Sequence, residues 1–194
     1  MENYKMNRDL FLKDYFKKLE KLMSFSDREI KKMIAVSDLI KEAHKQKRKT
    51  LIFGNGGSAA IASHFSVDLT KNARVRCTNY NESDLLTCFS NDYGYDKWVE
   101  KALEFYSDED DVLILISASG SSKNMINAAN YAKKNKIKSI VTLTGNKEDN
   151  PLKKLGDINF WVNSAAYNHI ENIHQIILLS LVDLIIGKSE YSAN

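Results

Sequence analysis

A short, continuous apolar run constrains the fold of this chain more than any other feature. Residues 112–116, Val-Leu-Ile-Leu-Ile, stand between Asp111 and Ser117. A strand that is apolar at every position needs both of its faces covered, as in parallel sheets that carry helices on each side. Four further strand-like segments occur at 50–53, 75–80, 139–143 and 158–162. The run therefore predicts the central strand of a parallel sheet.

Segments with apolar residues at helical spacing alternate with these strands. They cover 58–70, 83–90, 95–106, 123–135, 151–155 and 167–186. Strands that alternate with helices imply parallel strands joined by helical crossovers. We therefore predict an α/β fold, a three-layer α-β-α sandwich with a five-stranded parallel sheet. Residues 1–194 suit a single domain, of which 48–194 form the core.

Residues 1–47 are predicted to form an N-terminal helical arm. Apolar side chains recur at helical spacing over 8–24 and 27–46, and Ser26 or Asp27 between them suits an N-cap. The arm can pack on its own domain or on another subunit. We favour a subunit interface, because two long amphipathic helices outside the sheet need a partner.

Charge and composition limit the classes of partner. The net charge is +3, and the lysines are spread along predicted helices without a basic block, so nucleic acid is not expected. The longest apolar stretch, 173–186, is interrupted by Asp183, so no membrane span is expected. Cys77 and Cys88 fit neither a disulfide nor a metal framework, and the N-terminus does not read as a signal sequence. A cytoplasmic location follows as an expectation.

A glycine-rich segment follows the first predicted strand. Residues 54–60 read Gly-Asn-Gly-Gly-Ser-Ala-Ala and lead into a predicted helix. Glycines let a backbone approach a ligand closely, and a helix start directs free amides at an anion. Ser58 adds a hydroxyl donor. Neither the P-loop lysine nor the dinucleotide-binding glycine spacing is present, which weakens a nucleotide interpretation.

A serine-rich segment repeats this design after the central strand. Residues 117–122 read Ser-Ala-Ser-Gly-Ser-Ser and precede another helix. Ligands of open parallel sheets bind outside the carboxyl ends of the strands. One such segment alone can be a plain turn or helix cap. Two of them in one small sheet predict a phosphate site built from Ser58 and the serines of 117–122.

These motifs together resemble a known family. GNGGSA followed by His64, then Asn91-Asp92-Tyr93-Gly94, then SxSGxS, is similar to the sugar isomerase (SIS) domain family, and within it to the phosphoheptose isomerases. The resemblance spans most of the chain. It implies a homotetramer, often with zinc, that interconverts sedoheptulose 7-phosphate and glycero-manno-heptose 7-phosphate for surface polysaccharides such as lipopolysaccharide or capsule.

By the match of motifs, the resemblance also assigns substrate-binding residues. Those expected to contact the phosphosugar are Asn55, Gly56, Gly57, Ser58, Asn91, Asp92, Ser117, Ala118, Ser119 and Ser122. The phosphate is expected on the serines, and the sugar on the asparagines and the neighbouring glycines.

The expected catalytic residues are Glu171, Asp68 and His64. Aldose–ketose isomerisation needs a base that moves a proton between two carbons. His64 and Asp68 lie at i and i+4 of a predicted helix, hence on one face, although a surface pair is the alternative. The family has His and Glu at these two positions, so Asp68 is one methylene shorter.

The last predicted helix departs further from the family pattern. The family has a Gln and, eight residues later, a His that acts in catalysis and binds metal; here these positions are Glu171 and Leu179. We predict that Glu171 has become the base. His174, one turn from Glu171, reads as either a site residue or a hydrogen-bonded core histidine. A weakly held zinc on His64, Asp68 and Glu171 is the corresponding metal prediction.

Two functional hypotheses follow. The first is a phosphosugar aldose–ketose isomerase of the phosphoheptose type, which Glu171 favours. The second is a non-catalytic SIS protein that binds a phosphosugar and regulates a protein partner, as do relatives that bind the bacterial replication initiator. Leu179 favours the second, because relatives of that type also lack the late histidine. We favour the enzyme.

Overall fold

The sheet that the sequence predicts is present. The computed structural model describes residues 6–192, so the first five residues of the expected arm lie outside the described part. All strands are parallel, in the order β2-β1-β3-β4-β5. The strands are β1 (Thr50–Phe53), β2 (Cys77–Thr78), β3 (Val112–Ser117), β4 (Ser139–Thr144) and β5 (Ile158–Trp161). The α/β prediction with five parallel strands is therefore confirmed.

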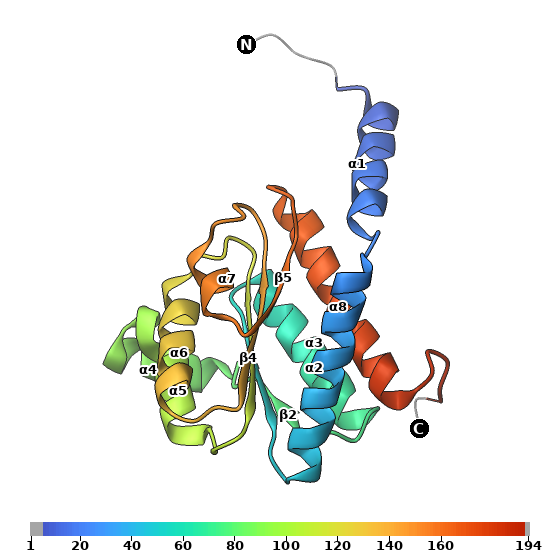
Figure 1. The fold of residues 1–194 in the computed structure, drawn as a ribbon. Coiled ribbons are helices and arrows are strands. Elements are labelled where there is room, and N and C mark those ends of the chain that lie inside the picture. Colours follow the sequence, from blue (N-terminus) through green and yellow to red (C-terminus); the bar gives the residue numbers. More distant parts are fainter. Residues whose placement is uncertain (1–5, 193–194) are drawn as a thin grey trace.

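Helices cover both faces of this sheet (Figure 1). They are α1 (Arg8–Leu22), α2 (Asp27–Lys45), α3 (Gly57–Lys71), α4 (Ser83–Tyr93), the 3₁₀ turn η1 (Tyr95–Lys97), α5 (Trp98–Tyr106), α6 (Lys123–Lys134), α7 (Pro151–Leu155) and α8 (Tyr167–Ile186). One apolar core joins the sheet to α2, α3 and α8, and a second core joins its other face to α5 and α6.

The central strand β3 separates the two cores. All six of its residues are buried. Ile114 and Ile116 belong to the core beneath α3 and α8, whereas Leu113 and Leu115 belong to the core beneath α5 and α6. Alternate residues of a strand point to opposite faces. The continuous apolar run is thus explained by helices on both sides.

Two elements differ from the sequence prediction. The strand expected over 75–80 contains only two residues, because the Val75 N–H bonds to the Leu69 carbonyl of α3 and Tyr80 has a positive φ of 50°. The helix expected over 95–106 begins with a 3₁₀ turn, and Gly94 before it has a φ of 87°. Both differences lie in connections, where local hydrogen bonds outweigh the hydrophobic pattern.

The N-terminal arm divides into two parts. Helix α2 buries Met33, Val36 and Ile40 in the core. Helix α1 extends away from the body (Figure 1) and has no buried residue. Leu10, Phe11, Leu12 and Phe16 of α1 are each at least half exposed. A free helix of 15 residues is marginal in water, so α1 presents apolar surface that its own domain leaves uncovered.

Helix α8 is the one helix within residues 6–192 whose length and apolar composition would suffice to cross a membrane. It packs against α2 and α3, and Ile170, Ile173 and Ile177 are among its buried residues. These contacts account for its apolar composition as that of a core helix.

Candidate functional site

The glycine-rich and serine-rich segments lie side by side. We call residues 54–58 the first loop and residues 117–122 the second loop. They follow β1 and β3, which are neighbours in the sheet with Phe53 opposite Leu115. Because the two strands are parallel, their carboxyl ends meet at one edge, as the predicted phosphate site requires.

The first loop turns the chain sharply into α3. Gly56 has a φ of 54°, a conformation that favours glycine. The Ser58 N–H donates to the Asn55 carbonyl, and no side chain caps the start of α3. Helix starts of this kind present backbone amides and a positive dipole end to an anion. The buried Ser58 lies in this first turn.

The second loop gathers its hydroxyl groups. Ser117 Oγ lies 2.9 Å from Ser122 Oγ and 3.4 Å from Ser119 Oγ. Ser117 and Ala118 are buried, and α6 begins directly after Ser122 without a side-chain cap. Gly120 has a φ of 66°, and a Cβ there would overlap the Asn150 side chain. Three of the serines expected to bind phosphate therefore converge, while their role as ligands stays a prediction.

The side chain of Asn55 is directed at protein groups. Its Nδ2 donates to Asn124 Oδ1 over 3.0 Å, and its Oδ1 accepts from Asn124 Nδ2 over 2.8 Å. Tyr95 Oη donates to the same Oδ1 over 2.9 Å. Both polar atoms of this side chain therefore have partners within the protein, and its contact with the sugar stays a prediction.

Asn91 and Asp92 are hydrogen-bonded to each other. Both are exposed at the carboxyl end of α4, and Asn91 Nδ2 donates to Asp92 Oδ1 over 3.0 Å. Cys88 Sγ donates to the other Asp92 oxygen over 3.6 Å. The segment reaches the first loop through Tyr95, three residues after Asp92, and not through the two predicted residues themselves.

A cavity of about 370 Å³ lies between α3 and α8. Its walls are formed by Gly57, Ala60, Ile61, His64, Asn168, Glu171, Asn172 and Gln175. His64 Nε2 lies 3.3 Å from Asp68 Oδ2, and His64 Nδ1 lies 3.2 Å from Gln175 Nε2. Two of the predicted catalytic residues, His64 and Glu171, therefore face one space, and Asp68 pairs with the imidazole.

Glu171 lies against the start of α3. A Cβ on Gly57 would overlap the Glu171 carboxylate, so the carboxylate lies directly against the Gly57 backbone. The half-buried carboxylate consequently borders both the first loop and the cavity. Leu179, two turns along α8, brings no donor or acceptor to this helix face.

The predicted zinc ligands are only partly assembled. Across residues 6–192 no three His, Cys, Asp or Glu side chains form a group that could hold a metal ion. Both ring nitrogens of His64 already lie within hydrogen-bonding distance of Asp68 and Gln175. As placed, His64, Asp68 and Glu171 do not fit a tetrahedral zinc centre. Zinc binding stays a prediction, and no catalytic step is derived through it.

His174 points away from this cavity into the core. It is fully buried, and its Nε2 lies 3.1 Å from the Thr144 carbonyl oxygen at the end of β4. Its Nδ1 has no hydrogen-bond partner among the described residues. Burial lowers the pKa of His174 to about 4. His174 therefore lies where a hydrogen-bonded core histidine would lie, the second of the two predicted alternatives.

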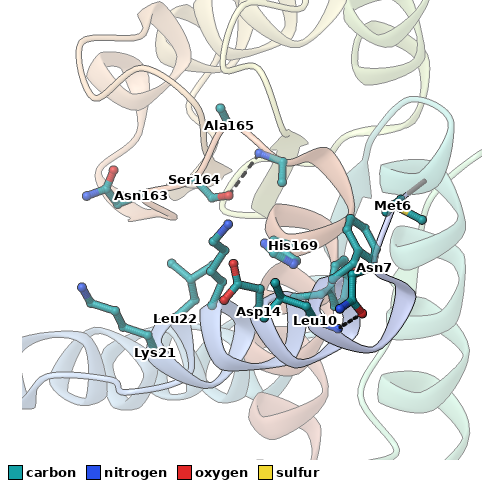
Figure 2. Close-up of a pocket in the computed structure, with 14 residues that line it drawn as sticks. Met6, Asn7, Leu10, Asp14, Lys21, Leu22, Asn163, Ser164, Ala165 and His169 are labelled. Atoms are coloured by element: carbon teal, nitrogen blue, oxygen red, sulfur yellow. Dashed lines mark hydrogen bonds between the residues drawn. The ribbon is translucent and has the colours of Figure 1, made fainter. Parts of the chain in front are cut away.

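A larger cavity of about 990 Å³ separates α1 from residues 163–166 (Figure 2). Leu10 and Phe11 line it from the arm, and His169 lines it from α8. The His169 ring packs edge-on against Tyr15, with 4.3 Å between ring centroids. His169 is buried, and its Nε2 finds no hydrogen-bond partner within the described part of the chain. Apolar side chains of α1 and the buried His169 of α8 thus line one hollow.

A family of known proteins matches the part of the chain that contains both loops. The sequence model of the family described as SIS domain matches residues 14–145, from the arm through β4. The chain belongs to the SIS domain family. The match covers both loops and the whole of α3, which carries His64 and Asp68.

Phosphoheptose isomerases are among the relatives of this SIS chain. The enzyme of Sodalis glossinidius is 34% identical over 187 residues, which are 90% of this chain and 95% of that protein. The enzyme of Buchnera aphidicola subsp. Acyrthosiphon pisum is 34% identical over 152 residues, 73% of this chain and 78% of that protein. A solved phosphoheptose isomerase from Neisseria gonorrhoeae has a TM-score of 0.83 at 25% identity, covering 91% of this chain and 98% of its own. One from Francisella tularensis, at 24% identity, shares the fold with a TM-score of 0.85 over 94% and 100%.

The SIS site includes side chains that the sequence argument missed. Gln175 lies one turn after Glu171 on α8, so i, i+4 spacing could have indicated it. Tyr95 and Asn124 carried no such signal, because their contacts with Asn55 span 40 and 69 residues of sequence.

The buried His174 predicts an acid-sensitive fold. An unfolded imidazole takes up a proton near pH 6.5, whereas the folded one does so only near pH 4, so stability falls as the pH drops between these values. Between pH 7 and pH 5 we expect wild type to lose about 2 kcal/mol more unfolding free energy than His174→Gln. Urea denaturation at both pH values measures this, and equal losses in the two proteins would contradict it.

Proposed function

We propose that this chain is a phosphosugar aldose–ketose isomerase that interconverts sedoheptulose 7-phosphate and glycero-manno-heptose 7-phosphate. One observation carries the proposal: the Glu171 carboxylate lies between the first loop and a cavity that also contains His64. A phosphate-binding edge thus adjoins an acid–base group. The phosphoheptose isomerases to which the chain is similar support the choice of substrate.

The reaction requires a proton to move from C1 to C2 of the sugar through an enediolate. A carboxylate beside the bound sugar can take the proton from one carbon and return it to the other on the same face of the planar intermediate. Glu171 has this chemistry, and Leu179 does not. With the phosphate on the two loops, the opposite end of the sugar would enter the cavity beside Glu171.

His64 can serve the sugar oxygens in the same step. An amide nitrogen only donates, so the Gln175 Nε2 contact makes His64 Nδ1 an acceptor and leaves the Nε2 proton toward Asp68. The imidazole would reach a sugar oxygen once His64 Nδ1 exchanges its Gln175 contact for the substrate. Asp68 then orients His64 instead of acting as the main base.

The proposed assembly is a homotetramer with composite sites. The uncovered apolar face of α1 and the hollow between α1 and α8 support it, since a second copy of the chain can fill both (Figure 2). A cytoplasmic location belongs to the same proposal.

A regulatory phosphosugar-binding protein is the competing function. Leu179 supports it, because the loops would still bind a phosphosugar when proton transfer is lost. Turnover of a ketose phosphate distinguishes the two functions, because only the isomerase converts the sugar that it binds.

A turnover assay separates these functions. We expect the purified chain to convert sedoheptulose 7-phosphate faster than other ketose phosphates of a panel, each tested with and without added zinc. Elemental analysis after mild dialysis is expected to find less than one zinc per chain, because Leu179 replaces a family ligand. Binding without turnover of any ketose phosphate would leave the regulatory function in its place.

Two carboxamide variants test the assignment of the base. Glu171→Gln is expected to lower turnover of sedoheptulose 7-phosphate by more than about a hundredfold, the usual effect of removing an acid–base group. Asp68→Asn, the matched control on α3, should cost less. The phosphosugar affinity of both variants should stay near that of wild type. Near-normal turnover by Glu171→Gln would exclude Glu171 as the base.

Sedimentation equilibrium tests the assembly. We expect a tetramer at micromolar concentration, and a smaller species for Phe16→Ser, because Phe16 is 60% exposed on α1. Phe105→Ser is the matched control, since Phe105 is 57% exposed on α5 across the sheet. A stable wild-type monomer at this concentration would overturn the proposed assembly.

A further inference from the structure

A reciprocal pair of amide hydrogen bonds connects the two phosphate loops. Asn55 and Asn124 each donate to the other's carbonyl oxygen, over 3.0 Å and 2.8 Å. Asn55 belongs to the first loop, and Asn124 lies in the first turn of α6, two residues after the second loop ends. The two residues are 69 positions apart in the sequence.

Tyr95 adds a third segment to this pair. Its hydroxyl donates to Asn55 Oδ1 over 2.9 Å, so that oxygen accepts two hydrogen bonds, the usual capacity of an amide carbonyl. The 3₁₀ turn that carries Tyr95 is itself bound to α6, because Asn127 Nδ2 donates to the Asp96 carbonyl over 2.8 Å. The loops and the 3₁₀ turn thus form one connected unit.

The Asn124 side chain, which makes these hydrogen bonds, is shielded from water. Asn124 is 2% exposed, and its Oδ1 also accepts from the Met125 N–H over 3.1 Å. Loss of the Asn55 amide would leave polar atoms of the buried Asn124 without a partner, which costs more than one solvated hydrogen bond. The arrangement of the two loops is therefore coupled to both side chains.

Sheet pairing alone does not determine how far apart the loop tips lie. The ladder between β1 and β3 reaches Phe53 and Leu115, and both loops continue beyond it. A phosphate held by two loops needs their donors at one separation, and a displacement of about 1 Å can cost a hundredfold in rate. The Asn55–Asn124 hydrogen bonds join the two chain segments beyond the end of this ladder.

We propose that Asn55, Asn124 and Tyr95 form a latch that sets the distance between the first and second loops, in which the Asn55 and Asn124 side chains act as positioning residues. The inference rests on the proposed phosphosugar site, but it does not need turnover.

A double-mutant cycle tests the latch with inorganic phosphate as the probe. Asn55→Ala and Asn124→Ala should each weaken phosphate binding about tenfold, and the double variant should lose no more than either single one, because the second change removes a hydrogen bond already broken. Isothermal titration calorimetry measures each dissociation constant. If Asn55→Ala loses as much affinity in the Asn124→Ala background as in wild type, Asn55 binds the ligand directly and the latch is wrong.

Further variants separate positioning from folding. Tyr95→Phe should weaken phosphate binding about two- to fivefold, as expected for one hydrogen bond, and Tyr106→Phe, a control on α5, should leave it unchanged. Lower melting temperatures with unchanged phosphate affinity would mean a purely structural role and would reject the proposal. If Asn124→Ala does not fold, Asn124→Asp, which has the same shape and lacks the amide donor, replaces it in the cycle. A latch that passes these tests in a protein without turnover would reject only the isomerase.

Discussion

The parallel pairing of β1 with β3 is the constraint on which the candidate site depends. It places two loops, each followed by a helix start, at the same edge of the sheet. Because these two strand ends are neighbours, the serine hydroxyls come close to the start of α3, and Asn55 can contact Asn124. Helices on both faces keep β3 dry, and that burial in turn requires the apolar sequence from Val112 to Ile116.

The phosphate and chemical halves of the site follow different rules. The loops use backbone amides and small hydroxyl groups, which depend on the turn and tolerate little change. The cavity between α3 and α8 uses side chains on two packed helices, so a substitution there alters the chemistry without altering the fold. The family resemblance predicts that Glu171 and Leu179 are substitutions of this kind, and the contact between Glu171 and Gly57 places the carboxylate beside the first loop.

The sequence sufficed for the sheet, the helical layers and the two loops, because each depends on local periodicity and on glycine or serine at a turn. It overestimated β2, because the Val75 N–H bonds to the Leu69 carbonyl of α3 and Tyr80 has a positive φ. It could not predict the hydrogen bonds of the Asn55 side chain, because their partners, Asn124 and Tyr95, lie far away in the sequence. It missed Gln175, Tyr95 and Asn124, whose contacts with the site residues depend on tertiary packing.

Solvent isotope exchange tests most directly whether the first and second loops and the cavity between α3 and α8 together catalyse isomerisation by proton transfer. Sedoheptulose 7-phosphate is incubated with the protein in D₂O and followed by NMR. A base that shuttles a proton through an enediolate exchanges it with solvent, so deuterium is expected at C2 of the aldose product and at C1 of the recovered ketose. Product without deuterium would indicate transfer that bypasses a solvent-exchanging base, and no product at all would contradict an isomerase.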